Sequence, residues 1–498
     1  MQSLIKKYES AIFLSVIFLI GTLLRFYQID FNSLWYDELF TWQQSGRKSF
    51  IDVLEYGVWK DTHPPAHIIV MYITQNLFGD SEIILRAPSA IAGALTIPVA
   101  YLLARDLYSQ RVGLYAASIV ACSYQLIYYS QEARVYALLG FFVLVACWTF
   151  YRLMCTEKYG DQKLCTFRLA YIVSAVLCIY SHHFGMVFVA GQFAFLVVNA
   201  KFRINIIKKE LMTFLYIALA SMPAAYLLVH HLFNTIGNTN WIPPLTLKFY
   251  YDLFKGMMGD SKIISIVTLG ISILAIVISA KSKSYNVSHG SRYLLFCCLF
   301  VLAITTIFSI TVKPMMIERY FLFLAPIVYI LISQCITYLS SSKKIGNFVV
   351  VLLCTSMFYQ LIWVEKYYFE SSRPNTKDVS LLIKEYVESS KSNDCLIYCH
   401  AWSNKFMAQY YFDKYDIKKI PDLHISVNLF DENPTTYSEQ FSEIINDEKC
   451  SRLLVFFDNI GNSHVNRFNR LKTTFENSGD ITLINSHEYY KSSLRVYQ

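Results

Sequence analysis

The chain has 498 residues, of which 55% are hydrophobic and only 16% are charged, and its mean hydropathy is +0.36. This composition is too apolar for an ordinary soluble protein and predicts a polytopic membrane protein. The formal net charge of +8 does not indicate a nucleic-acid partner, because the Lys and Arg residues form short clusters between apolar runs and no contiguous basic face.

The N-terminal segment combines a basic start with an apolar run that is too long for a signal peptide, so it predicts an uncleaved first span. A membrane helix needs about 20 apolar residues. Reading the chain for such runs predicts eleven spans, at residues 10–27, 86–104, 112–129, 135–151, 169–181, 184–200, 211–230, 263–280, 293–311, 320–339 and 345–364.

The segment from His63 to Gly79 is apolar but short, with a Pro pair at its start and Gln75 and Asn76 near its end. If it does not cross the bilayer, five basic loops fall on the side of the basic N-terminus, as the positive-inside rule requires. If it crosses, all five move outside. It is therefore predicted to be a juxtamembrane helix, with a cytoplasmic N-terminus and everything after residue 364 outside.

After Arg373 the apolar runs shorten to strand length and alternate with helical patterns, which predicts a small extracytoplasmic α/β domain. Its expected helices are 375–390, 403–412 and 465–479, and its expected strands are 395–400, 452–457 and 481–490. No glycine-rich phosphate loop follows these strands, so no nucleotide site is expected. The predicted domains are thus a transmembrane domain over 1–366, with a first external loop at 28–85, and an α/β domain over 367–498.

With this topology, the outward ends of the spans carry a set of polar and charged residues. Charges near hydrocarbon are unfavourable, and when they gather on one side of a bilayer they mark a functional site by default. Taken singly, each is equally well explained as a helix cap or a side chain reaching the surface. The set consists of Asp37, Glu38, His63, Tyr129–Leu138, Tyr180–Gly185 and Ile317–Tyr320.

Asp37 and Glu38 are neighbours, so their side chains point in different directions and different roles are expected for them. One carboxylate suits a general base acting on an acceptor hydroxyl, and the other suits orientation of an arginine or a metal ion. Arg134 and Arg319 offer forked donors that match phosphate oxygens, and His183 is a further candidate donor. Together these three resemble a phosphate clamp.

Two further expectations concern Glu132 and His63. On a helix, Gln131 and Arg134 share a face and Glu132 is offset, so Glu132 is a candidate partner for Arg319. His63, with His182 or His183, is a candidate for binding a divalent metal ion, although no close His/Asp ligand spacing supports this alternative.

These residues resemble the polytopic GT-C glycosyltransferases that use lipid-phosphate sugars, specifically the branch with protein O-mannosyltransferases and the bacterial lipid A aminoarabinose transferase. The resemblance rests on WYDE, HPP, LFGDSEIILRAPSAIAGALT, YYSQEARVYALL, HHFG and ERYFLFLAP. It is most specific over residues 31–139, and it covers the C-terminal domain only by position and type. It implies a GT-C fold with about 11 transmembrane helices plus juxtamembrane helices.

The resemblance also implies a donor such as an undecaprenyl-phosphate-linked sugar and an inverting transfer by direct displacement at the anomeric carbon. By motif, Asp37 resembles the catalytic base and Glu38 its partner carboxylate, whereas His63 matches the family's HPP position. The other expected site residues are Arg134, Arg319, His183 and Tyr320 at the donor phosphate, and Glu132, Arg86 and Tyr129 in support.

The predicted function is therefore transfer of a sugar from a polyprenyl-phosphate donor to an envelope glycan or glycolipid, such as lipopolysaccharide, on the periplasmic side of a bacterial inner membrane. The one Asn-X-Ser/Thr sequon, at residues 286–288, falls on the predicted cytoplasmic side, which favours a bacterial membrane over the endoplasmic reticulum. The expected partners are this donor, the acceptor and membrane lipids, without nucleic acid. A divalent metal ion is an open alternative as cofactor.

Three alternative functions remain: a protein O-glycosyltransferase, a transporter and a glycan ligase. A transporter typically carries charges and broken helices near the bilayer midplane, often in repeated halves, whereas here the charges favour one face and no repeat is found. A ligase is expected to have a larger external loop late in the chain, whereas the longest external loop with acidic residues lies first, at residues 28–62.

Overall fold

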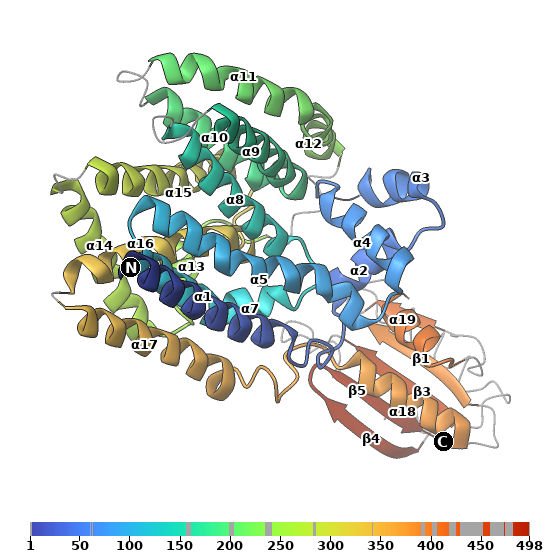
Figure 1. Cartoon of the computed structure of the whole chain (residues 1–498). Coiled ribbons are helices and arrows are strands. Elements are labelled where there is room, and N and C mark those ends of the chain that lie inside the picture. Colours follow the sequence, from blue (N-terminus) through green and yellow to red (C-terminus); the bar gives the residue numbers. More distant parts are fainter. Residues whose placement is uncertain are drawn as a thin grey trace. The chain divides into compact units, whose positions relative to one another are not determined.

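Figure 1 shows the computed structural model of the chain. The structure describes residues 2–59, 61, 63–155, 161–198, 204–234, 242–281, 285–340, 342–389, 394–400, 406–417, 425–428, 452–458, 473 and 482–497. These residues divide into two compact units, a first unit of Met1–Ile29 with Gln44–Lys366 and a second unit of Asp30–Gln43 with Tyr367–Gln498. A short segment from the predicted first external loop thus belongs with the C-terminal part of the chain.

The described part of the first unit is helical. Its longest helices are α1 (Gln2–Phe26), α5 (Glu82–Leu107), α8 (Tyr136–Met154), α9 (Asp161–Ser181), α14 (Lys262–Lys281), α15 (Tyr285–Thr311) and α17 (Lys343–Tyr359). Its shorter helices are α3 (Phe50–Asp52), η1 (Val53–Val58), α4 (Ala66–Phe78), α6 (Gln110–Cys122), α7 (Tyr124–Ser130), α10 (His183–Val198), α11 (Ile204–Ala220), α12 (Met222–Asn234), α13 (Leu247–Met257), η5 (Glu318–Leu324), α16 (Ala325–Leu339) and η6 (Gln360–Val364).

Within the described residues, seven helices are long and apolar enough to cross a membrane, or nine if each of two bent pairs forms one span. The prediction of a helical polytopic membrane protein is confirmed. The predicted count of eleven includes two more segments, which correspond to α14 and to α10, a helix of only 16 residues. The segment predicted to be juxtamembrane forms α4, a short apolar helix of 13 residues.

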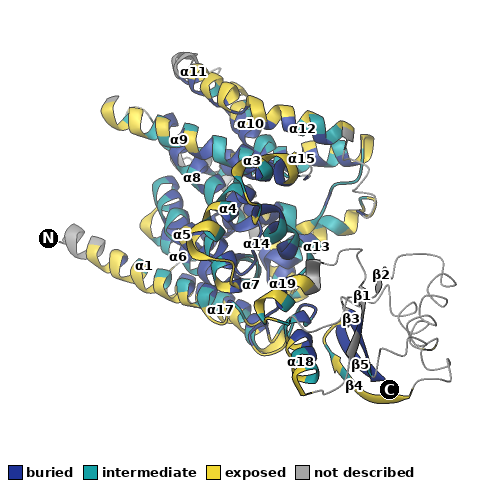
Figure 2. Cartoon of the chain, turned by 90° about the vertical axis from the view of Figure 1, so that its right-hand side faces the viewer, coloured by how far each residue is buried: buried dark blue, intermediate teal, exposed yellow. Residues whose placement is uncertain are grey.

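Apolar side chains face outward on several of these helices. On α1, for example, Phe13 is 61% exposed and Leu23 is 59% exposed, and Figure 2 shows the exposed colour along much of this helix. Large exposed apolar faces are rare on soluble proteins, and in a bilayer they contact lipid. The opposite faces pack into one extended core that includes Leu144, Phe188 and Tyr293.

A buried arginine stabilises the sharp bend between α6 and α7. The two helices meet at an angle of 59°, and Ser123 between them has an extended backbone, which leaves the last carbonyls of α6 without helical partners. The guanidinium of Arg25, which is fully buried, donates to the carbonyls of Val120 and Ala121 at 3.0 and 3.2 Å. The cation also complements the negative end of the α6 dipole. The bend sets the direction of α7, which leads into the turn at residues 131–135.

The second unit contains a five-stranded sheet in the order β2-β1-β3-β5-β4, with β1 (Asp394–His400), β2 (Ile425–Asn428), β3 (Arg452–Asp458), β4 (Leu483–Tyr489) and β5 (Ser492–Tyr497). The pairs β1–β2 and β1–β3 are parallel, and β3–β5 and β4–β5 are antiparallel. Helix α18 (Thr376–Ser389) packs on β3 and β5 and also contacts α19 (Phe406–Lys414) (Figure 1).

This sheet agrees with the predicted α/β class. The helices expected at 375–390 and 403–412 correspond to α18 and α19, and the three expected strands correspond to β1, β3 and β4. The strands β2 and β5 were not predicted. The helix expected at 465–479 lies outside the described residues, except for residue 473.

We expect Gly185 to be essential for the tight junction between α9 and α10. A Cβ atom at this position would overlap the backbone carbonyl of Cys178, which cannot move without separating the two helices. The substitution Gly185→Ala should therefore destabilise the protein by about 1–3 kcal/mol, as overpacking typically does. Thermal unfolding of the purified protein in detergent measures this effect.

Gly270 provides the matched control, because a Cβ atom on this helical glycine would meet nothing within 4 Å. Gly270→Ala should leave the midpoint unchanged or raise it slightly, since Ala favours a helix over Gly. Equal midpoints for the two variants would contradict the steric argument.

Candidate active site

Residues Gln131 to Val135 form the turn between α7 and α8, and hydrogen bonds hold this turn in place. The side-chain amide of Gln131 donates to the carbonyls of Arg25 and Tyr27 at the end of α1, at 3.1 and 2.9 Å. The hydroxyl of Ser89 donates to the carbonyl of Arg134 at 2.9 Å. Because the turn is not helical, the prediction that Gln131 and Arg134 share a helix face is wrong. The turn instead places both Glu132 and Arg134 in buried positions.

Tyr320, in the first turn of η5, lies at the centre of an aromatic cluster. Its ring centroid is 5.0 Å from that of His182, 6.2 Å from that of Tyr136 and 6.5 Å from that of His63. Tyr136 in turn contacts Tyr129 at 5.4 Å. The cluster therefore joins four segments that are far apart in the sequence, as the grouping of the polar motifs predicts.

Arg319 and Glu132 belong to the same region. The Arg319 guanidinium lies 5.9 Å from the centre of the Tyr320 ring, a cation–π distance. Tyr129 is close enough to both Glu132 and Arg319 for their charges to act on its hydroxyl. Whether Glu132 orients Arg319 stays a prediction, but the charges of both groups act on the same tyrosine.

His182 lies buried in the turn between α9 and α10. The backbone N–H of Phe184 donates to its Nδ1 at 3.1 Å, so the neutral ring carries its hydrogen on Nε2. Burial lowers the pKa of His182 well below its ordinary value, and the positive charges of His63, His183 and Arg134 lower it further. His182 is therefore a neutral hydrogen-bonding group in a region of positive potential.

His63 lies close to His182 and is held by a neighbouring acid. Its Nδ1 lies 3.2 Å from a carboxylate oxygen of Asp61, which orients the ring, and its centroid is 5.8 Å from that of His182. Among the described residues, no group of three or more His, Cys, Asp and Glu side chains has the geometry to hold a metal ion. The pair therefore does not fit a metal centre by itself, since bound transition metals typically have three or four protein ligands.

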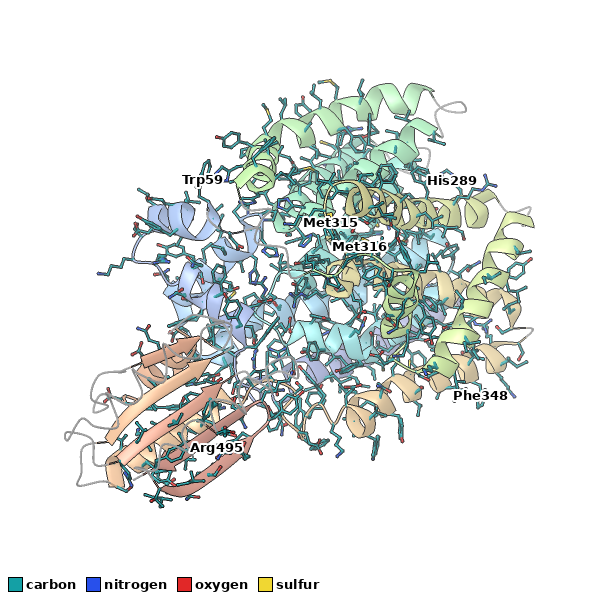
Figure 3. All side chains as sticks on the ribbon, turned by 180° about the vertical axis from the view of Figure 1, so that it is seen from behind. Trp59, His289, Met315, Met316, Phe348 and Arg495 are labelled. Carbon is teal, nitrogen blue, oxygen red and sulfur yellow. The ribbon has the colours of Figure 1, made fainter. Side chains whose placement is uncertain are left out.

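A cavity of about 220 Å³ opens beside this cluster. One part of its wall is polar and carries His63, His182, His183, Lys313 and Tyr320. The remainder is mostly apolar, with His231 and Thr305 as its polar members. It comes from α10, α12, the segment before α13, α15 and the loop after α15, with Met315 of this loop visible in Figure 3. Its apolar lining residues are Phe184, Met186, Val187, Leu228, Leu232, Ile242, Ile304, Phe308, Pro314 and Met315.

Lys313 is a cavity residue that the sequence analysis did not predict. It lies half-buried in the loop between α15 and η5, next to Pro314. Its sequence signal is a single Lys-Pro pair just after a predicted span, at the end of that span that is predicted to face outward like the other polar motifs. Its ammonium adds a second type of cation to a site in which only arginines were expected.

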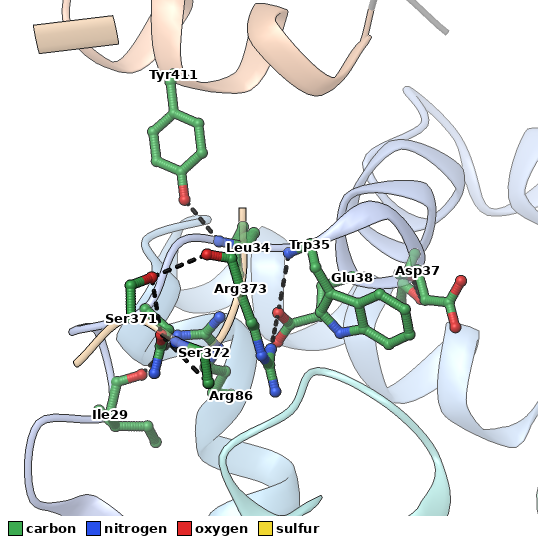
Figure 4. Close-up of polar contacts among 12 residues, drawn as sticks. Ile29, Leu34, Trp35, Asp37, Glu38, Arg86, Ser371, Ser372, Arg373 and Tyr411 are labelled. Atoms are coloured by element: carbon green, nitrogen blue, oxygen red, sulfur yellow. Dashed lines mark hydrogen bonds and ion pairs between the residues drawn. The ribbon is translucent and has the colours of Figure 1, made fainter. Parts of the chain in front are cut away.

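Asp37 and Glu38 belong to the second unit and begin helix α2 (Tyr36–Ser45) (Figure 4). Glu38 is fully buried, and one of its carboxylate oxygens accepts from the Arg373 guanidinium at 2.6 Å and from the backbone N–H of Trp35 at 3.3 Å. Asp37 is only half-buried. The two neighbouring acids thus lie in different environments, and the different roles expected for them stay predictions.

Arg86 has a structural contact in the first unit. It is buried and donates to the carbonyl of Ile29 at 2.7 Å, where the first unit's N-terminal segment ends. This hydrogen bond holds the backbone of Ile29 at the start of the predicted first external loop. Such a contact is compatible with the supporting role expected for Arg86.

Residues 62–230 match the family model described as dolichyl-phosphate-mannose-protein mannosyltransferase. The solved structure of ArnT from Cupriavidus metallidurans bound to undecaprenyl phosphate superposes with a TM-score of 0.59 and 11% identity, and the match covers 98% of this chain and 97% of ArnT. The chain has the GT-C fold. A second match is the oligosaccharyltransferase of Archaeoglobus fulgidus in complex with Zn and sulfate, with a TM-score of 0.54, 14% identity, and coverage of 89% and 67%. No curated protein matches in sequence.

These matches bear directly on the sequence analysis. The predicted resemblance to GT-C glycosyltransferases that use lipid-phosphate sugars is confirmed, and the family match confirms the enzyme class, a glycosyltransferase. At 11% identity, the similarity to ArnT concerns the GT-C fold. The individual roles of the site residues stay predictions.

The depressed pKa of His182 predicts a specific pH dependence. Because protonation is favoured in the unfolded chain and opposed in the folded one, the stabilising contribution is complete above the ordinary pKa and is lost as the pH falls below it. Between about pH 7.5 and about pH 5.5 we expect this residue alone to reduce the free energy of unfolding by about 1.4 kcal/mol. Thermal melts of the wild type and His182→Gln across this range measure the difference.

His487→Gln in the second unit is the control, since His487 lies outside the cavity and bonds the hydroxyl of Tyr386. The wild type and His487→Gln should lose the same stability on acidification, whereas His182→Gln should lose less. Parallel curves for all three proteins would argue against a buried neutral His182.

Proposed function

We propose that the chain is an inverting glycosyltransferase that moves a sugar from a polyprenyl-phosphate donor to an envelope glycan or glycolipid on the periplasmic side of a bacterial inner membrane. The observation that carries this proposal is the cavity, whose wall combines Lys313 and four histidines with a large apolar surface. A polyprenyl phosphate has the same division, with an anionic head and an apolar tail. The matching ArnT structure is bound to undecaprenyl phosphate, which supports this donor class.

The positive groups suit the leaving phosphate. Arg134 acts on His182 through its charge, and Arg319 lies over the ring of Tyr320, so both cations lie near the polar wall that Lys313 lines. Guanidinium and ammonium groups stabilise the negative charge that grows on a phosphate as it departs. The neutral ring of His182 can donate a hydrogen bond from its Nε2–H without being protonated.

The proposed reaction is a single displacement. The oxygen of the acceptor hydroxyl attacks the anomeric carbon of the sugar from the face opposite the phosphate. The bond between that carbon and the phosphate oxygen breaks, and its electron pair leaves with the lipid phosphate. Asp37 takes the proton of the hydroxyl, as a general base positioned within hydrogen-bond reach does. Inversion at the anomeric carbon follows from the direction of attack.

Asp37 suits the base better than Glu38 because of their environments. The carboxylate of Glu38 is fully buried and already neutralised by Arg373, so protonating it would leave the Arg373 charge uncompensated. Asp37 is half-buried. Glu38 then serves as the partner carboxylate by fixing α2. The divalent metal ion stays a prediction, and no step above uses one.

A second candidate function is transfer to a Ser or Thr hydroxyl of a protein. The observation in its favour is the family match over residues 62–230, whose description names protein mannosylation. The chemistry at the donor is the same, and only the acceptor differs. Mass spectrometry of envelope glycans and of the glycoproteome, with and without this chain, separates the two, because the sugar disappears from one fraction only.

Asp37→Asn should abolish transfer, with a fall in kcat of at least about 100-fold, because the amide cannot accept the proton. The assay uses the donor and acceptor that the glycan comparison identifies, with protein levels and thermal midpoints matched to the wild type. Asp80→Asn is the control, since Asp80 is an exposed acid in the same predicted external loop and should keep full activity. Turnover by Asp37→Asn at the wild-type rate would remove the proposed base.

Lys313→Met should weaken binding of undecaprenyl phosphate by about 10- to 100-fold, the value of one charge-assisted hydrogen bond. Titration of the purified protein with this lipid measures the affinity. Lys248→Met is the control, because the Lys248 side chain is 80% exposed on α13 and pairs with Asp252 at 3.7 Å. The same affinity for both variants would place the phosphate elsewhere.

A further inference from the structure

The segment Asp30–Gln43, which we call the Asp37 segment, lies within the second unit and not with the spans that flank it in the sequence. It carries the two acids of the proposed reaction. Its neighbours in the second unit are residues 371–377, which follow the last predicted span and include the start of α18, and helix α19 (Figure 4). The C-terminal domain therefore contacts the segment that carries the proposed base.

Residues 371–377 bind the residues before α2 through hydrogen bonds to both their side chains and their backbone. The backbone N–H of Ser372 donates to the side-chain oxygen of Asn32 at 2.9 Å, and the backbone N–H of Lys377 donates to the hydroxyl of Ser33 at 3.0 Å. The ammonium of Lys377 donates to the carbonyl of Asp30 at 3.1 Å. Asn32 and Ser33 are buried, so these bonds are shielded from competing water.

Helix α19 holds the same segment from a second direction. The hydroxyl of Tyr411, which is fully buried, accepts from the backbone N–H of Leu34 at 2.7 Å. Tyr410 packs edge-on against Trp42 at 5.0 Å between ring centroids. The start of the segment and its end are therefore both attached to one helix of the α/β domain.

The ion pair between Glu38 and Arg373 is the central contact. Arg373 is 3% exposed and Glu38 is 0% exposed, and the guanidinium also lies 5.9 Å from the centre of the Trp35 ring. Glu38 in turn bonds the N–H of Trp35, the residue before α2, as in a capping box. The pair thus fixes both the position of α2 and the direction of its first turn, which presents Asp37.

We propose that Arg373 is a positioning residue for the transfer reaction: through Glu38 and together with Tyr411, it holds α2 so that Asp37 is presented to the acceptor hydroxyl. The C-terminal domain thereby positions the catalytic base. This inference rests on the proposed function. It predicts that weakening the contacts of Arg373 and Tyr411 with the Asp37 segment lowers turnover and leaves donor binding intact, because the proposed phosphate-binding residues belong to the other unit.

The test uses the full-length protein in lipid nanodiscs with three variants. Arg373→Met removes the charge and keeps an apolar side chain of similar length. Arg373→Lys keeps the charge but loses the forked geometry, and Tyr411→Phe removes only the hydroxyl that binds Leu34. Lys384→Met is the control, since Lys384 carries the same charge on α18 and pairs with Glu388 at 3.7 Å, outside the Asp37 segment.

Three quantities are measured for each protein: amide hydrogen exchange over residues 30–43, affinity for undecaprenyl phosphate, and kcat. For Arg373→Met we expect exchange in the segment to rise about 10-fold or more, kcat to fall about 100-fold, and lipid affinity to stay within about twofold of the wild type. Arg373→Lys and Tyr411→Phe should show smaller changes of the same kind, and Lys384→Met should show none.

Two results would overturn the proposal. Unchanged exchange over residues 30–43 in Arg373→Met and Tyr411→Phe would mean that these residues do not hold the segment. Faster exchange with an unchanged kcat would mean that the hold does not serve the reaction. If the wild-type protein itself shows no transfer, the proposed function fails, and the exchange measurements still decide whether Arg373 holds α2.

Discussion

A lipid phosphate keeps its tail in hydrocarbon while its charged head requires polar partners, and this requirement explains how the first unit is built. Charged side chains cannot be placed freely among apolar helices, because each is unfavourable there unless partnered. The chain concentrates its polar and charged site residues where helices are interrupted: Arg134 in the turn between α7 and α8, neutral His182 in the turn between α9 and α10, and Lys313 in the loop before η5. Each interruption supplies both a polar side chain and the backbone hydrogen bonds that hold it.

The interruptions themselves are stabilised by buried polar groups. Arg25 satisfies the last carbonyls of α6, Gln131 satisfies those at the end of α1, and the Phe184 N–H bonds the His182 ring. Of these residues, only His182 and Phe184 also line the cavity. They allow helices of a membrane domain to end inside the protein without leaving backbone groups exposed to hydrocarbon.

The second unit places two neighbouring carboxylates in different environments, so that one is accessible and the other is neutralised by an ion pair. Glu38 is buried and neutralised by Arg373, whereas Asp37, one residue earlier, stays half-buried. A helix rotates successive side chains by about 100°, so a step of one residue suffices to separate the two environments. The burial of one acid thereby defines the availability of the other.

The sequence by itself determined the features that depend on local pattern: the membrane class, the positions of the apolar helices, the strands β1, β3 and β4, and several of the polar motifs that meet around Tyr320. Hydropathy and periodicity are local properties, so neighbouring residues suffice to read them. Tertiary structure decided the rest. The partner of Glu38 lies 335 residues away, Lys313 enters a cavity through the path of its loop, and β5 is defined by its pairing with β3. Such contacts depend on how distant segments pack, which no local pattern records.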